Sequence, residues 1–524
     1  MEAIQLIVML LAVVAIVTLA AARIGVPYPI LMVIGGLALG LVPAFPRIEL
    51  DPELVLLLFL PPILFSAAYF QSPRELWRNV RPISLLAIGL VVTTTLAVAA
   101  VLVTLVPGIT WPVAIALGAI VSPPDAIAAT SIARRLGLPR RLVTIIEGES
   151  LVNDASALTI YRLAVAAALP SVAAAPVGPL EIGLGFVTIA VGGMLIGVAV
   201  GLGVVWLLGR LDDPPVEVLI TLIAPFAAYL PAEALHVSGV LAAVSGGLVV
   251  GWRSSRVMSS TTRILGMGTW KMATFVVNGM AFLLIGLQLP TVMAAVDGRS
   301  AGQLAGLATA VAATVILVRL VWVFPATYLP RWLIPSVGRR DPAPPPTAPL
   351  VLGWAGMRGA VSLAAALALA SDFPERDLLV FLTFTTILVT LVGQGLTLPW
   401  LIGRVGLGDD GSAEHEELHA REAATQAAIR RLDELEDEIP GHRPLIDQLR
   451  DRYAHRSEHY SRAHGDGDEL VEDPEEEEHE RIRRAVIGAE RLAVLELRDD
   501  GAIGDEVLRR VERDLDLEEL RRDV

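Results

Sequence analysis

Long apolar runs separated by short polar stretches fill roughly the first 400 residues of the chain. Apolar runs of about 17–25 residues are long enough to cross the hydrocarbon core of a bilayer as helices. The pattern predicts thirteen membrane spans, near residues 2–21, 26–43, 53–70, 83–106, 112–133, 143–168, 182–208, 216–233, 236–252, 268–290, 302–326, 348–370 and 378–402. The first run follows no basic segment and exceeds the apolar core of a signal peptide, so we expect it to be an uncleaved span.

Arginine and lysine residues in the loops predict the orientation of these spans. With the N-terminus outside, the inner loops hold 16 basic residues and the outer loops hold 3. Loops on the cytoplasmic side are typically enriched in these residues. The alternation therefore favours an odd number of spans and a cytoplasmic C-terminal tail.

Composition divides the chain into two parts. The whole chain has 524 residues, of which 54% are hydrophobic and 18% charged. From residue 409 onward there are 36 acidic and 18 basic residues, which leaves 19 acidic and 23 basic residues before it. We therefore predict a membrane domain over residues 1–407 and an acidic, helical cytoplasmic domain over residues 408–524, with helices near 414–438, 444–463, 480–498 and 505–520 and an acidic linker at 465–478. The negative tail argues against nucleic acid as a partner, and the absence of cysteine excludes disulfides.

The sixth span carries far more polar residues than its length allows a packing helix to hold. Its central part reads TIIEGESLVNDASAL and contains Glu147, Glu149, Asn153 and Asp154. An ionisable group at membrane depth costs about 3 kcal/mol or more. Residues four apart share a helix face, so Ser150 lies with Asp154, and Glu149 lies with Asn153. The pattern indicates a helix that handles charge.

Two other spans have interrupted backbones. The fifth contains Pro123 and Pro124 directly before Asp125, and two prolines remove two backbone donors. The twelfth contains Gly353, Gly356 and Gly359 around Arg358. If two six-helix repeats flank the seventh span, these breaks occupy matching places, which is typical of a transporter binding site.

These features together predict a cation site. A hard alkali cation prefers several oxygen ligands, which Asp154, Ser150 and Asp125 can supply with the carbonyl groups freed at Pro123 and Pro124. Without a cation, a carboxylate buried in apolar surroundings binds a proton instead. Competition between H+ and a metal ion at Asp154 would exchange one for the other. No resident cofactor is expected.

Buried arginines need counter-charges. Arg358 is expected to pair with Glu149, which would tie the sixth span to the twelfth. Arg162 and Arg319 are expected to extend towards the ends of their spans. In the seventh span, Gly193, Gly197 and Gly201 predict a close helix contact, either within the chain or across a dimer.

These residues bear on three functional classes: an antiporter, a cation channel and a membrane enzyme. An antiporter explains the carboxylates and the paired breaks. A cation channel would not need the charge-pair framework. An enzyme has little support, because the membrane part lacks a nucleophile with its base, a cluster of metal ligands and a phosphate-binding loop. The chain is therefore not expected to be an enzyme.

The segments EGESLVNDASAL, SPPDAIAAT, FVVNGMAFLLIGLQL and GWAGMRGAVSLA closely resemble the monovalent cation:proton antiporters of the first branch, which include bacterial sodium/proton antiporters and animal sodium/proton exchangers. The resemblance covers about residues 1–405. It implies an all-helical polytopic membrane protein with thirteen spans, two inverted six-helix repeats, crossed broken helices, and a homodimer that works by an elevator-like motion.

The resemblance also implies roles for individual residues. Asp154 resembles the transport aspartate of the family, and Asn153 resembles the asparagine that accompanies electroneutral exchange. Ser150 and Asp125 resemble residues of the cation site, and Glu149 with Arg358 resembles the buried ion pair. The expected activity is exchange of Na+ for H+ across the cell membrane, serving pH and sodium homeostasis; K+ as the cation is the alternative.

One position departs from the family pattern. Many members have threonine directly before the aspartate of the fifth span, where this chain has Pro124. The carbonyl of Pro124 can still face a cation, but a hydroxyl ligand is absent. The choice between Na+, K+ and Li+ is therefore left open.

Overall fold

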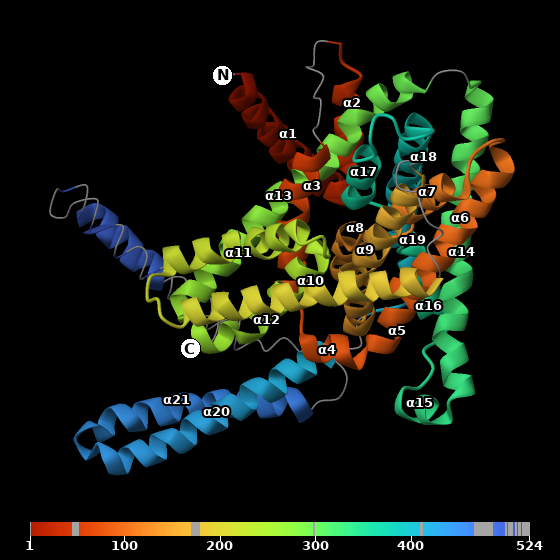
Figure 1. Ribbon diagram of the computed structural model, residues 1–524. Coiled ribbons are helices and arrows are strands. Elements are labelled where there is room, and N and C mark those ends of the chain that lie inside the picture. Colours follow the sequence, from red (N-terminus) through yellow and green to blue (C-terminus); the bar gives the residue numbers. More distant parts are fainter. Residues whose placement is uncertain are drawn as a thin grey trace. The chain divides into compact units, whose positions relative to one another are not determined.

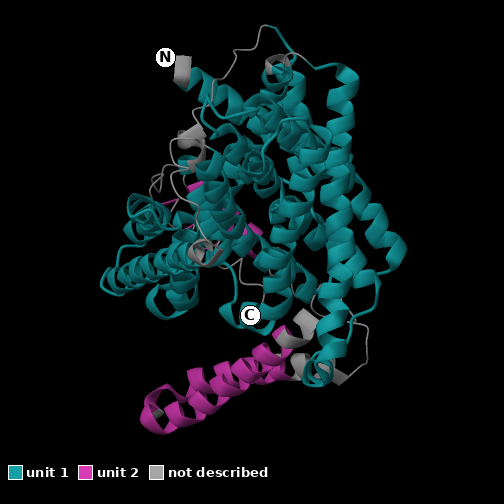
Figure 2. Ribbon diagram, turned by 45° about the vertical axis from the view of Figure 1, so that its right-hand side comes forward, with its two compact units in different colours: residues 1–409 teal, residues 410–524 magenta. Residues whose placement is uncertain are grey.

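The computed structural model describes residues 2–43, 52–168, 179–296, 299–408, 412–465 and 486–497, with residues 500, 507, 508, 511 and 515. These residues form helices, turns and irregular segments, and no strand occurs among them. They divide into two compact units, residues 1–409 and 410–524 (Figure 2).

The first half of unit 1 contains short helices as well as long ones (Figure 1). Their bounds are α1 Glu2–Ile24, α2 Tyr28–Gly40, α3 Pro52–Tyr69, α4 Pro73–Arg78, α5 Val80–Ser84, the π-helix η1 Leu85–Leu90, α6 Val91–Leu105, α7 Trp111–Val121, α8 Ala126–Arg135, α9 Arg140–Ala168 and α10 Pro179–Leu208.

The second half of unit 1 has the same character. Its helices are α11 Pro214–Ala234, α12 Gly239–Val257, α13 Ser260–Ala295, α14 Ala301–Leu333, α15 Pro335–Arg340, α16 Thr347–Trp354, α17 Ala360–Leu367, α18 Arg376–Leu388, the π-helix η2 Val389–Gln394 and α19 Gly395–Val405.

Helix occurs in every one of the thirteen ranges predicted to span a membrane. Within the described residues, eight helical segments are both long enough and apolar enough to cross a membrane, and two shorter apolar helices accompany them. The charged helix α9 is not among the eight. Crossing by thirteen segments remains a prediction.

Unit 1 is built from two groups of helices. In one group, α10, α11 and α12 pack on one another, α3 packs on α12, and α2 packs on α13. In the other, α9 packs mainly on α7, and also on η1 and α8, while α14 packs on α6 and α16. We call the first group the α12 bundle and the second group the α9 bundle.

The glycine pattern of the seventh span makes a contact inside the chain. A Cβ atom on Gly193 or Gly197 of α10 would overlap backbone carbonyl groups of Ser238 or Ala242, which lie at the start of α12. Among the described residues, α10 and α12 form the most extensive helix pair. Of the two predicted uses of this glycine pattern, the structure supports the contact within the chain.

Unit 2 contains a helical hairpin. Helices α20 (Ser412–Glu438) and α21 (Arg443–Gly465) pack against each other across a 3-10 turn, Pro440–His442. Arg450 joins them through ion pairs with Asp433 and Glu436. Residues 486–497 are also helical. The predicted linker at 465–478 and helix at 505–520 lie largely outside the described residues.

Candidate functional site

The two predicted helix breaks exist and touch each other. The break between α7 and α8 covers Ser122–Asp125, and the break between α16 and α17 covers Ala355–Gly359. The backbone N–H of Asp125 donates to the carbonyl of Met357 at 2.7 Å. A Cβ atom on Gly359 would overlap the Asp125 carboxylate, so glycine allows this close approach.

Asp125 lies at the beginning of two helices. Its carboxylate accepts a hydrogen bond from the N–H of Ile127 at 2.8 Å, which caps α8, and it also lies beside the N–H of Ala360 in the first turn of α17. The N-terminal N–H groups of a helix lack internal partners and carry partial positive charge. One carboxylate therefore caps α8 and faces the positive N-terminal end of α17 as well.

Arg358 lies at the C-terminal ends of α7 and α16, the half-helices that precede the two breaks, and is fully buried. Its guanidinium donates to the carbonyls of Val121 at 2.8 Å and Ser122 at 3.0 Å, where α7 ends, and to the carbonyl of Gly356, just beyond α16. The backbone N–H of Arg358 donates to the hydroxyl of Thr390 in η2. Carbonyl groups at helix C-termini carry partial negative charge, so this cation compensates both ends.

The predicted ion pair between Glu149 and Arg358 is wrong. Glu149 pairs instead with Arg319 of α14, at 2.5 and 2.8 Å, and both side chains are 1% exposed. Arg319 also donates to the carbonyl of Leu352 in α16. The physical reason is that Arg358 is committed to helix carbonyl groups, whereas Arg319 lies midway along α14. The expectation that Arg319 extends towards a membrane surface fails with it.

Asn153 and Asp154 face this crossing from α9, and both are buried. The amide of Asn153 donates to the carbonyl of Pro124 at 3.3 Å, while its Oδ1 has no partner among the described residues. The carboxylates of Asp154 and Asp125 are close enough to repel each other when both are charged. In the described part of the chain, Asp154 accepts no hydrogen bond and joins no ion pair. Ser150 lies one turn before it and is half-buried.

The structure thus brings most of the predicted residues together. Where α9 passes the crossed breaks, four groups meet: the side chains of Asp125, Asn153 and Asp154 and the carbonyl of Pro124. Arg358 and Glu149 lie beside this group, and each has partners of its own. Sequence reasoning missed the pairing of Arg319 with Glu149 and the contact that Thr390 makes with Arg358. A longer reading of α14, which continues through Pro325 and Pro330, would have placed Arg319 near the middle of its helix.

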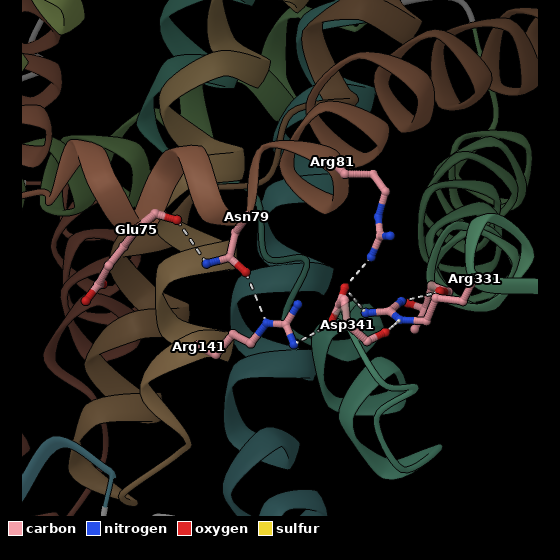
Figure 3. A network of polar contacts seen from close by, with 7 residues as sticks. Glu75, Asn79, Arg81, Arg141, Arg331 and Asp341 are labelled. Atoms are coloured by element: carbon pink, nitrogen blue, oxygen red, sulfur yellow. Dashed lines mark hydrogen bonds and ion pairs between the residues drawn. The ribbon is translucent and has the colours of Figure 1, made fainter. Parts of the chain in front are cut away.

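A second polar cluster joins α5, α9 and α14 (Figure 3). Arg81 of α5, Arg141 of α9 and Arg331 of α14 all contact the carboxylate of Asp341, which follows α15. Partial burial opposes ionisation of Asp341, but the bonds and charges of Arg141 and Arg331 outweigh it, so its pKa lies below the usual 3.8. This cluster ties three helices of the α9 bundle together.

Comparison with known families gives one match over most of the chain. Residues 8–403 match the family described as "Sodium/hydrogen exchanger, transmembrane". The match includes both broken helices and α9.

Two relatives and one solved structure extend this match. An uncharacterized Na+/H+ exchanger of Mycobacterium tuberculosis is 36% identical, with 98% of this chain and 95% of that protein covered. A sodium, potassium, lithium and rubidium/H+ antiporter of Bacillus pumilus is 31% identical, with 78% and 62% covered. The sodium proton antiporter MjNhaP1 of Methanocaldococcus jannaschii has a similar fold, with a TM-score of 0.56, 17% identity and coverage of 76% of this chain and 98% of that chain.

Proposed function

Since the chain belongs to the sodium/hydrogen exchanger family, we propose that it is a secondary antiporter that exchanges Na+ for H+ at Asp154. One observation carries the assignment to this residue. Asp154 is buried beside the crossed helix breaks, and the described residues give its carboxylate no hydrogen bond and no counter-ion. A charge left this way at membrane depth costs about 3 kcal/mol or more.

Asp154 avoids that cost by carrying either a proton or a cation. Oxygen atoms for a cation are close at hand: the Asp125 carboxylate, the Ser150 hydroxyl and the unpartnered Oδ1 of Asn153. The carbonyl of Pro124 accepts from Asn153 and holds that amide in place. Na+ and H+ therefore compete for one carboxylate.

The surrounding charges support electroneutral exchange. Asp125 and Arg358 carry opposite charges at the crossed breaks, one at helix N-termini and the other at helix C-termini, and Glu149 is offset by Arg319. This framework is neutral, so the charge of the site depends on Asp154 alone. One Na+ or one H+ neutralises it equally, and neither loaded form carries net charge across the membrane.

The remaining parts of the proposal concern the whole protein. We propose thirteen spans in two inverted six-helix repeats, with the N-terminus outside the cell membrane and unit 2 in the cytoplasm, working as a homodimer in pH and sodium homeostasis. The fold match to MjNhaP1 and the distribution of basic residues support this arrangement.

A K+/H+ exchange activity is the second candidate. The Bacillus pumilus relative is named for sodium, potassium, lithium and rubidium. Pro124 also gives this chain a carbonyl where many family members have a hydroxyl. Side-by-side assays with Na+, K+ and Li+ distinguish the two cations.

The test uses everted vesicles that hold the full-length protein. Adding Na+ should release protons from acidified vesicles, and Asp154→Asn should abolish the response, because an amide cannot exchange a proton for a cation. A variant that still responds would refute the role of Asp154. Gly403→Ala, which meets no atom within 4 Å, is a matched control.

The same vesicles separate an antiporter from a channel. A net charge crossing the membrane gains about 2.3 kcal/mol per 100 mV. Electroneutral exchange should therefore proceed at the same rate with and without an imposed potential. A rate that follows the potential would favour a conducting pathway.

A further inference from the structure

One face of α9 runs along the α12 bundle and is apolar in its middle. Leu151 and Ala155 are buried there together with Leu60 and Leu64 of α3, and Leu158 packs against the same cluster. Tyr229 of α11 and Val240, Leu241, Ala243 and Val244 of α12 complete it. The spacing of 151, 155 and 158 keeps these side chains on one face of the helix. We call this contact the seam.

Each end of the seam has a polar contact. Position 162 continues the apolar face by one turn, and Arg162 pairs there with Glu233 of α11 at 2.7 and 2.8 Å. Position 147 lies one turn before Leu151, and Glu147 accepts hydrogen bonds from Arg134 at 2.6 Å and from Gln71, which follows α3. The helix that carries Asp154 thus contacts the other bundle through polar groups on both sides of the site.

Glu233 is held in position from its own bundle. Its carboxylate also accepts the N–H of Gly239 at 3.3 Å, in the first turn of α12. The positive end of that helix favours a carboxylate there. Glu233 therefore stays in place when Arg162 leaves, so opening this pair does not leave a carboxylate without a donor.

Two of the ion pairs of α9 differ in how readily they can open. Glu149 and Arg319 are each 1% exposed, and separating them would bury two unpaired charges. Arg162 and Glu233 are 41% and 29% exposed, so water can solvate each group when they separate. The first pair lies within the α9 bundle, and the second joins the two bundles.

We propose that Arg162 and Glu233 form a latch that closes the seam on one side of Asp154 and opens during each transport cycle. Eight residues separate Arg162 from Asp154, which is about 12 Å along the helix. Among the described residues the apolar seam has no hydrogen bonds to break, so on this side of Asp154 the latch is the polar contact that holds the two bundles together. Both residues are positioning residues, because neither touches the transported ion. The proposal rests on the antiport function proposed above, and in the proposed orientation the latch lies on the outer side.

The test tethers the latch. The chain contains no cysteine, so Arg162→Cys with Glu233→Cys introduces a single reactive pair. Arginine and glutamate side chains together span more than a disulfide reaches, so a short bis-methanethiosulfonate reagent is used. Tethering should reduce Na+-dependent proton release at least about tenfold, because a closed pathway blocks every cycle. Dithiothreitol should restore the rate.

A tether within one bundle is the control. Ser245 of α12 donates to the carbonyl of Met194 in α10, so Met194→Cys with Ser245→Cys places a matched pair inside the α12 bundle. Mass spectrometry verifies both tethers. The control tether should leave transport unchanged.

The possible outcomes are distinct. Normal transport in the tethered latch variant, beside an active wild type, would overturn the latch alone. An inactive wild type would instead overturn the antiport function on which the latch rests. If the double-cysteine variant is inactive before tethering, Arg162→Glu with Glu233→Arg decides: recovery relative to Arg162→Glu supports the latch, and no recovery overturns it.

Discussion

At the scale of single residues, the site is an arrangement of charges in which one carboxylate remains unmatched. Asp125 meets helix N-termini, Arg358 meets helix C-termini, and Glu149 meets Arg319. Each interaction lowers the cost of keeping a charge away from water. Asp154 has no such interaction in the described part of the chain, which leaves its carboxylate open to a proton or a cation.

Replacing Arg319 tests this arrangement directly. Arg319→Met leaves the buried Glu149 carboxylate uncompensated, and breaking a buried pair typically costs about 3–5 kcal/mol. We expect a clear drop in the melting temperature of the detergent-solubilised protein. Removing both charges, with Glu149→Met added, should recover much of that drop.

Arg358→Met supplies the contrasting case. Its partners are backbone carbonyls, so adding Glu149→Met should give no recovery. If Glu149→Met rescued Arg358→Met and failed to rescue Arg319→Met, the pairing would be the one first predicted from the sequence.

At the scale of elements, the crossing works because each broken helix offers free backbone groups of both signs. Asp125 and Arg358 each serve two helices, so the breaks need no further ions to remain together. Helix α9 passes beside them and is tied to α14 twice, at Glu149 and through Arg141 at Asp341. We infer that the α9 bundle keeps its internal geometry when the seam moves.

The Asp341 cluster gives a prediction about acid stability. Because the pKa of Asp341 is lower in the folded protein, its contribution is complete above the ordinary value of 3.8 and is lost as the pH falls towards the lowered value. The melting temperature of the wild type should therefore fall in this range. Asp341→Asn should start lower and lose less on acidification.

Asp377→Asn is the matched control. Asp377 makes a longer ion pair with Arg376, at 3.5 Å, and is 55% exposed. The difference between wild type and Asp377→Asn should stay small at every pH. An Asp341→Asn profile parallel to that of the wild type would contradict the role given to the cluster.

At the scale of the whole molecule, the two units have different chemistry. Unit 1 contains every residue assigned to the site, and unit 2 contains a hairpin with ion pairs that water reaches at least in part. Exposed pairs contribute little to stability, about 0–1 kcal/mol each. The proposed exchange site therefore lies in unit 1 alone.

Truncation after Leu407 tests this division. The shortened protein should insert and still exchange Na+ for H+, and a regulatory role of unit 2 would appear as a shift of the pH at which the rate is highest. Proton release from vesicles, normalised to inserted protein, measures both quantities. Complete loss of exchange in correctly inserted protein would contradict the assignment to unit 1.

The sequence by itself predicted the helices of the membrane domain and both breaks, which the structure contains, and it singled out Asp154 as the central aspartate. These features depend on local properties: the length of an apolar run, the missing donors of Pro123 and Pro124, and charges within one span. The match to the sodium/hydrogen exchanger family confirms the family predicted from the motifs.

Only the tertiary structure decided which buried charges meet. Glu149 can in principle reach an arginine on any neighbouring helix, and spacing along the chain cannot rank Arg319 against Arg358. The packing of α14 beside α9 and the crossing of the two broken helices make that choice. The latch at Arg162 was likewise invisible in the sequence, because its partner Glu233 lies 71 residues away on a helix of the other bundle.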